Sequence, residues 1–332
     1  MLPNDQPRAL EKRADVSVGC SIFECIILSS PHEWMCSDML DCLVIGGGPA
    51  GLLAAVYLGR YRRSVQVIDA GESRAAKIPE SHNYPGFFGI AGPELLRRLT
   101  AQARQYGAEL VSGRVTSLRK EGDTFVASSS GSGVNARFIL LATGLVDQCP
   151  TIEGQPADCP SEVIRFCPIC DGYEAIDHRV GVVGDIKAGG KKALFLRTYT
   201  KDVSLFLTDE TEDVDWQEKL AKANVRIAGN LKQVRQTTEN TITVVTQLGE
   251  THEVDALYPA LGCIVRSDLA TGLGASSTEN GNLEVDGHQR TTIGGLYAAG
   301  DVVTDLHQLS VAFGHAAIAA TDIHNRLPPN PR

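Results

Sequence analysis

The segment Gly46-Gly47-Gly48-Pro49-Ala50-Gly51 constrains the fold of this chain more than any other feature of the sequence. An apolar run over residues 40–45 precedes it, and apolar residues recur with helical spacing over 50–60. A second apolar run, over 65–68, ends at Asp69. This order predicts a strand, a tight turn, a helix and a second strand, which together form a β–α–β unit of roughly thirty residues.

The glycine spacing within this unit is typical of a dinucleotide-binding turn. Gly46 permits the tight turn, Gly48 lets the backbone approach a pyrophosphate, and Gly51 lets the helix pack closely on the strand. The N-terminus of the helix then faces the phosphate charge. Asp69 ends the next strand, where its carboxylate can accept hydrogen bonds from ribose hydroxyls. The sequence therefore predicts a dinucleotide at this turn.

A second β–α–β pattern begins near residue 180. We expect a strand over 180–183, a helix over 191–199 and a strand over 203–207. Further strands are expected over 137–142, 242–247, 255–261 and 295–299, and a long helix over 309–325. Two such units predict an α/β fold with two doubly wound, Rossmann-like domains. The second domain is expected to be inserted into the first, because a C-terminal Gly-Asp motif belongs chemically with the first.

Charge and composition exclude several classes of protein. At ~100–200 residues per domain, 332 residues suit two domains. The chain carries 31 basic and 40 acidic residues, a net charge of −9, and no run of Lys or Arg, which argues against nucleic-acid binding. No apolar run reaches the ~18–20 residues that cross a bilayer, and no signal peptide is evident. We therefore expect a cytoplasmic protein that contacts neither nucleic acid nor membrane.

The chain has nine cysteines, an odd number with irregular spacing, which does not suggest a secreted disulfide framework. We expect Cys149 and Cys159 to be isolated thiols, and a second disulfide between them is the alternative. The exception is Cys167-Pro168-Ile169-Cys170, which is followed by Asp171. A C-x-x-C pair is either a redox pair or half of a zinc site, and buried inert thiols are a third alternative. The redox interpretation is favoured and no metal is expected, because the other cysteines are isolated and the histidines are scattered.

A final motif lies near the C-terminus, where Gly294-Gly295-Leu296-Tyr297-Ala298-Ala299 leads into Gly300-Asp301. A short strand that ends in Gly-Asp before a long helix can place a carboxylate and a helix N-terminus against a ligand. The alternative is an ordinary strand-to-helix junction.

Taken together, these motifs resemble the low-molecular-weight thioredoxin reductase family. The resemblance rests on GGGPAG, the Ala142-Thr143-Gly144 loop, CPICDG and GLYAAGD in this order, and it covers residues 39–327. It implies FAD as cofactor, a homodimer, and a thioredoxin-like protein or a small dithiol or disulfide as partner. It also implies domains at 39–150 and 264–332 for FAD and at 151–263 for the redox disulfide. Residues 1–38 show neither strand alternation nor a helical face, so we expect a poorly ordered extension, with a functional arm or an interface segment as the alternative.

The same resemblance implies roles for individual residues. Cys170 would face the flavin, Cys167 would attack the substrate disulfide, and Asp171 would donate and accept the proton of that exchange. Gln308 begins the last helix, where its backbone N–H would approach the pyrimidine edge of the flavin. The residues expected to bind the cofactor are Gly46, Gly48, Pro49, Ala50, Gly51, Asp69, Asn83, Ala142, Thr143, Gly144, Gly300, Asp301, Gln308 and Leu309.

The inserted domain departs from the family at its nucleotide site. Counted without gaps, the family's Gly-Gly-Gly-Asp-Ser-Ala falls on residues 184–189, so Ile186 replaces the glycine that approaches the pyrophosphate. We expect the Ile186 side chain to occupy the phosphate position, with the charge of Asp185 beside it. Asp209 and Glu210 stand where the family places two arginines for the 2′-phosphate of NADPH.

NADPH is therefore not expected as the electron donor, and the resemblance shifts to the NADPH-independent branches of the family. In these the flavin exchanges electrons with ferredoxin, with another flavin or with oxygen. One alternative is an NADH-dependent reductase, and another is a flavin-binding redox sensor. His307 and His315 are candidates for deprotonating a dithiol, against the alternative of a solvated and a core histidine.

Overall fold

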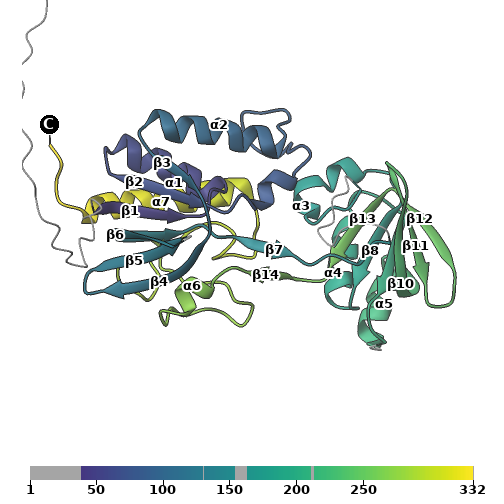
Figure 1. The fold of residues 1–332 in the computed structure, drawn as a ribbon. Coiled ribbons are helices and arrows are strands. Elements are labelled where there is room, and N and C mark those ends of the chain that lie inside the picture. Colours follow the sequence, from purple (N-terminus) through teal and green to yellow (C-terminus); the bar gives the residue numbers. More distant parts are fainter. Residues whose placement is uncertain (1–38, 130, 154–162, 211–212, 332) are drawn as a thin grey trace, which may run out of the picture. The chain divides into compact units, whose positions relative to one another are not determined.

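The computed structural model describes residues 39–129, 131–153, 163–210 and 213–331 (Figure 1). The expected extension over 1–38 and Cys159 lie outside the described residues. The described chain forms two large sheets and one short ribbon. This architecture confirms the predicted α/β fold class with two Rossmann-like sheets.

The first sheet has the order β3-β2-β1-β6-β5-β4, and β15 pairs with β6. Its parallel strands are β1 (Leu40–Ile45), β2 (Val65–Asp69), β3 (Glu109–Ser112), β6 (Ser132–Leu141) and β15 (Leu296–Ala298). Strands β4 (Val115–Glu121) and β5 (Thr124–Ser129) join antiparallel. The central strands β1 and β6 end in the apolar runs LVI and FILL, as is typical of parallel strands that are covered on both faces.

The helices of this part are α1 (Pro49–Arg60), α2 (Gly92–Gln105), α6 (Asp268–Thr271) and α7 (Leu309–Arg326). Helix α1 packs against α7 and α2 (Figure 1). Small buried residues such as Ala54, Ala316 and Ala320 lie in the core they share with β1. The C-terminal helix thus returns to the first β–α–β unit, as the sequence predicts.

The second sheet has the order β12-β11-β10-β9-β8-β13. Its parallel strands are β8 (Val180–Gly184), β9 (Val203–Leu207), β10 (Arg226–Thr238) and β13 (Ala256–Ala260), and β11 (Thr241–Thr246) and β12 (Thr251–Val254) are antiparallel. Helix α4 (Ala188–Leu196) contacts β8, β9 and β13, and α5 (Val214–Lys222) contacts α4 and β10. Helix α4 begins three residues earlier than predicted, after a turn in which the Asp185 carboxylate accepts from the N–H groups of Lys187 and Ala188.

Two crossings connect the sheets. Strand β7 (Leu145–Asp147) leaves the first sheet, β14 (Cys263–Val265) returns to it, and the two pair antiparallel (Figure 1). The predicted domain boundaries at 150/151 and 263/264 fall at this ribbon, and the division into domains stays a prediction. The redox segment, α3 (Pro168–Asp171) followed by the short helix η2 (Tyr173–Ala175), precedes β8.

Candidate redox and dinucleotide site

The first β–α–β turn is shaped by its glycines. Gly46 has φ +109°, and a Cβ there would lie 2.3 Å from the Ala142 carbonyl oxygen. A Cβ on Gly51 would lie 1.9 Å from the Gly46 carbonyl oxygen, so the close helix–strand packing expected at Gly51 is present. Helix α1 begins after Gly48 without a side-chain cap, and Gly48, Pro49 and Ala50 at its start line the cavity.

Asp69 lies against this turn. Its Oδ1 accepts a hydrogen bond from the Gly47 N–H at 3.0 Å. A Cβ on Gly47 would lie 2.6 Å from the Asp69 Cγ, so Gly47 allows the carboxylate to come this close. Gly47 is an additional residue of this turn, and its place between the two motif glycines is the sequence signal for it.

The predicted cofactor residues converge on one cavity of about 810 Å³. Gly300 has φ +81°, and a Cβ on it would lie 3.1 Å from the Ala50 Cβ, which places the Gly-Asp motif beside the first turn. Gly51 packs behind the turn and does not line the cavity. The predicted residues that line it are Gly46, Gly48, Pro49, Ala50, Asp69, Asn83, Ala142, Thr143, Gly144, Gly300, Asp301, Gln308 and Leu309, together with Cys167, Cys170 and Asp171.

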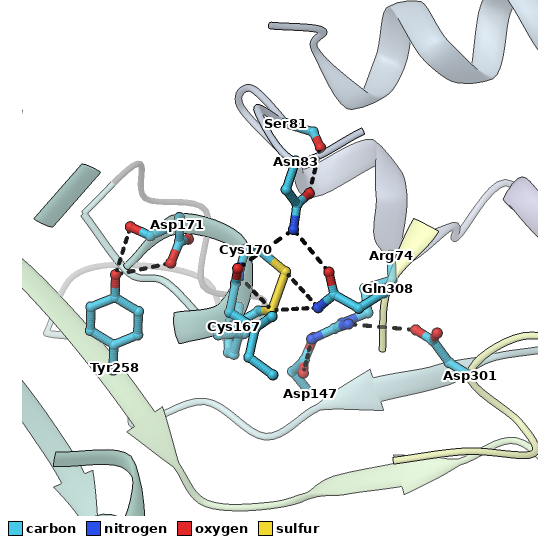
Figure 2. Close-up of a disulfide and its surroundings, with 12 residues drawn as sticks. Arg74, Ser81, Asn83, Asp147, Cys167, Cys170, Asp171, Tyr258, Asp301 and Gln308 are labelled. Atoms are coloured by element: carbon cyan, nitrogen blue, oxygen red, sulfur yellow. Dashed lines mark hydrogen bonds and ion pairs between the residues drawn. A yellow bond between two sulfur atoms is a disulfide. The ribbon is translucent and has the colours of Figure 1, made fainter. Parts of the chain in front are cut away.

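The redox pair faces the same cavity as a disulfide. Cys167 and Cys170 are joined across α3, and the Cys170 N–H donates to the Cys167 Sγ at 3.2 Å (Figure 2). The Gln308 side chain donates from Nε2 to both sulfurs, at 3.3 Å each. The prediction for Gln308 concerns only its backbone N–H, and this side-chain contact joins residues that are too far apart in the chain for local spacing to predict it.

Asp171 is held by a tyrosine that the sequence analysis missed. The Tyr258 hydroxyl on β13 donates to the Asp171 Oδ1 at 2.9 Å (Figure 2). Burial raises the pKa of Asp171 to about 6, and the Tyr258 hydrogen bond partly opposes that rise. Arg165 donates to the Asp171 carbonyl oxygen at 3.2 Å. Burial lowers the pKa of the nearby Lys192 to about 8. A carboxyl group that titrates near neutral pH can exchange a proton with a thiol.

Asp301 belongs to a buried ionic group at the edge of the cavity. Arg74 pairs with Asp147 on β7 through Nε at 2.6 Å and Nη2 at 2.9 Å, and its Nη1 lies 3.5 Å from Asp301 (Figure 2). Burial raises the pKa of Asp301 even though Arg74 opposes the rise. Burial has the opposite effect on the imidazole of His307, which also lines the cavity, and lowers its pKa.

The second candidate histidine, His315, lies on α7. Burial lowers its pKa, and among the described residues its Nδ1 is buried without a hydrogen-bond partner. Its role as a base for dithiols stays a prediction.

The start of α4 corrects one prediction. The Ile186 side chain is 1% exposed and packs in the core of the second sheet, so it does not occupy a phosphate position. Beside it, the Asp185 Oδ1 accepts from the N–H groups of Lys187 at 2.7 Å and Ala188 at 2.8 Å.

A cavity of about 1000 Å³ lies beside this turn. Its lining includes Asp185, Lys187 and Asp209 together with Pro168 and Ile169, the two residues between the redox cysteines.

Cys149 corrects a second prediction, because it is disulfide-bonded rather than an isolated thiol. Of the other described cysteines outside the redox pair, Cys42 is a buried free thiol and Cys263 is free on β14. Residues 39–331, apart from the gaps named above, contain no group of three or more His, Cys, Asp or Glu side chains placed to hold a metal ion. No helix of the described chain is long and apolar enough to span a membrane.

Comparisons with known proteins agree with this geometry. Residues 40–319 match the family described as pyridine nucleotide-disulphide oxidoreductase. The thioredoxin reductase of Streptomyces clavuligerus is 29% identical over 88% of this chain and 95% of its own length. The thioredoxin reductase of Listeria innocua is 27% identical over 84% of this chain and 91% of its own length.

Two solved structures extend the comparison. The crystal structure of HlmI matches with a TM-score of 0.81 and 28% identity over 89% of this chain and 93% of its own. Thioredoxin reductase from Streptococcus pyogenes matches with a TM-score of 0.76 and 25% identity over 86% of this chain and 97% of its own. The chain therefore belongs to the pyridine nucleotide-disulphide oxidoreductase family, as a thioredoxin-reductase-like, flavin-dependent disulfide oxidoreductase.

Proposed function

We propose that this enzyme moves an electron pair between FAD and a dithiol or disulfide substrate through Cys167 and Cys170, without NADPH. The carboxylate of Asp185 at the start of α4 carries the proposal. The other supporting features are the acidic residues after β9 and the cavity that joins the dinucleotide turn to the disulfide.

The two β–α–β turns of the chain differ at the position where phosphate binds. A helix N-terminus binds phosphate through N–H groups that have no partner within the helix. The start of α1 holds no side-chain cap, whereas the Asp185 carboxylate already bonds the N–H groups of Lys187, just before α4, and of Ala188, its first residue. A pyrophosphate at α4 would have to displace a carboxylate from both donors or lie beside its negative charge. This cost supports the absence of nicotinamide nucleotide binding.

The end of β9 adds a second unfavourable contact for NADPH. Asp209 and Glu210 are exposed directly after the strand, and Asp209 lines the cavity beside α4. A 2′-phosphate at this position would meet two carboxylates where a guanidinium pair would be favourable.

The residues of the first turn fit FAD. Gly46, Gly48 and the uncapped N-terminus of α1 would hold the pyrophosphate, and Asp69 would hold a ribose. FAD supplies the acceptor or donor of the electron pair. Its predicted neighbours Asn83, Gly300 and Asp301 line the same cavity as both cysteines.

The thiol–disulfide step then follows from the cysteine pair. A substrate thiolate attacks the Cys167 Sγ, the Cys167–Cys170 bond breaks, and Cys170 leaves as a thiolate. The second substrate thiol displaces Cys167, so the substrate leaves as a disulfide and the pair carries two electrons. Asp171 is close to the pair in sequence and titrates near neutral pH, so it is the proposed proton acceptor. The reverse order reduces a disulfide substrate.

The partners proposed are those implied by the family. The relatives named above suggest a thioredoxin-like protein, and the cavity of about 1000 Å³ beside Pro168 and Ile169 has the size of a small-molecule site. Ferredoxin, a second flavin or oxygen would complete the electron transfer in place of NADPH. The homodimer stays a prediction.

Anaerobic stopped-flow absorbance of the FAD-loaded protein tests this proposal. The protein is mixed separately with NADPH, NADH and a small dithiol, with Cys170→Ser as the control. We expect only the dithiol to bleach the flavin, and the control to remain yellow. Rapid bleaching by NADPH or NADH would contradict the proposal. If no dithiol bleaches bound FAD, the protein is a flavin-binding sensor instead.

A further inference from the structure

Gln308 lies between the redox disulfide and two polar side chains, Asn83 and Ser81, from the segment between β2 and α2 (Figure 2). We propose that its side-chain amide stabilises the thiolate that forms when the Cys167–Cys170 bond opens. We further propose that Asn83 and Ser81 hold this amide in its donating orientation. The inference rests on the proposed redox role of the pair, and it concerns the side chain of Gln308 rather than the predicted backbone contact with the cofactor.

The geometry brings one donor to two sulfurs. Gln308 Nε2 lies 3.3 Å from the Cys167 Sγ and 3.3 Å from the Cys170 Sγ. A carboxamide nitrogen carries two hydrogens, so it has one for each sulfur. The backbone of Gln308 is fixed at the start of α7, where its carbonyl accepts from the Ala312 N–H at 3.0 Å. The amide is therefore delivered to the disulfide by a helix terminus.

The orientation of the amide is set by its neighbours. Asn83 donates from Nδ2 to the Gln308 Oε1 at 2.9 Å and to the Ile169 carbonyl of the redox segment at 3.5 Å. The Ser81 hydroxyl donates to the Asn83 Oδ1 at 3.3 Å, and Ser81 exchanges two backbone hydrogen bonds with Ile90. If the Gln308 amide were rotated by half a turn, its Nε2 would face the Asn83 Nδ2, so that two donors would oppose each other. The Gln308 Oε1 would then lie against the two sulfurs. The hydrogen bonds from Ser81 to Asn83 and from Asn83 to Gln308, together called the relay, therefore favour the orientation in which the Gln308 Nε2 faces the sulfurs.

This arrangement favours the reduced pair over the disulfide. When the S–S bond accepts two electrons, at least one sulfur leaves as a thiolate, and hydrogen bonds to a charged acceptor are roughly twice as strong as neutral ones. Gln308 gains that difference only in the reduced state. It therefore raises the reduction potential of the pair and assists the departure of Cys170 when a thiolate attacks Cys167.

Redox equilibrium with dithiothreitol measures this effect directly. The full-length protein, with and without FAD, is equilibrated at fixed pH in buffers of varied reduced-to-oxidised ratio. Dithiothreitol is oxidised to its cyclic disulfide as the pair is reduced. The thiols are then alkylated, and mass spectrometry of the peptide that contains Cys167 and Cys170 gives the equilibrium constant independently of Cys149.

We expect Gln308→Met, which keeps the length of the side chain and removes both donors, to lower the equilibrium constant about tenfold. That change equals ~30 mV for two electrons. Gln308→Glu should lower it further, because a carboxylate repels the thiolate. Gln102→Glu, on the exposed face of α2, is the matched control.

Asn83→Leu tests the relay at an exposed residue, should the Gln308 variants fail to fold. We expect a smaller decrease, about threefold, because the amide keeps its donors but loses its fixed orientation. Equal constants in the wild type and in the Met and Leu variants would overturn the inference. A pair that no reagent ratio opens in any variant would instead contradict the proposed function.

Discussion

At the scale of single residues, the environment of Asp171 decides how its proton exchange depends on pH. The groups that face it are Tyr258 on β13, Lys192 on α4, Arg165 before α3 and Glu174 in η2. Burial raises the pKa of Asp171 to about 6, and the Tyr258 hydrogen bond and the two cations lower it. Because the pKa of Asp171 is higher in the folded than in the unfolded protein, ionising this group lowers the stability of the fold. The loss is absent below the unfolded-state pKa and develops as pH rises to about 6.

Tyr258→Phe removes one contact that favours the ionised form, so the pKa of Asp171 should rise further. We expect the limb of the pH–rate profile assigned to Asp171 to move up by about one pH unit, whether the group acts as acid or base. Stopped-flow rates of flavin bleaching by a dithiol, measured across pH, provide the test. Tyr173→Phe, which alters a phenol that is exposed on the same segment, should leave the limb in place. A limb that moves down in Tyr258→Phe contradicts this assignment.

The residue scale also shows where sequence reasoning ends. The motif glycines, Asp69 and the C-x-x-C pair were identified because their spacing is local. Gln308 and Tyr258 reach the redox segment from far along the chain, so no local spacing predicts their contacts. The side chain of Ile186 packs in the core of the second sheet, whereas the sequence predicts it at the phosphate position. A single glycine replacement does not reveal which way the turn after β8 points the new side chain.

At the scale of elements, strands buried on both faces were the ones that the sequence predicted well. Strands β1, β8 and β9 are almost entirely buried and read as apolar runs. Strands β4 and β10 were missed because most of their residues are exposed or half-buried, and their polar side chains hide the alternation. Helix α2 was missed although its N1–N2 region carries a proline, the usual signal of a helix start.

The cap of α4 gives a prediction at this scale. Asp185→Ala frees the N–H groups of Lys187 and Ala188, and loss of a cap costs about 1 kcal/mol of unfolding free energy. Asp185→Asn should cost less, because an amide oxygen still accepts. The matched control is Asp213→Ala, which removes the cap of α5 at Trp216 and should cost a similar amount. Urea unfolding compares the three, and an Asp185→Ala variant as stable as the wild type would contradict the capping role.

At the scale of the whole molecule, the β7–β14 ribbon carries the chain between the two sheets. The chain crosses at β7 and β14, and Arg74 ties β7 to the first sheet through its bidentate pair with Asp147. Both side chains are largely buried, at 22% and 16% exposed. A buried pair is costly to break from one side, because the remaining charge stays in a poor solvent.

Asp147→Ala should therefore destabilise the protein by about 3 kcal/mol, and Arg74→Met by a similar amount. The double variant should lose less than the sum, because neither charge is left alone. Glu94→Ala, which breaks the exposed pairs of Glu94 with Arg97 and Arg98 on α2, should cost much less than either single variant of the buried pair. Urea unfolding of the four variants measures these differences. If the single losses simply add, Arg74 and Asp147 act independently, and the tie between β7 and the first sheet lies in other contacts.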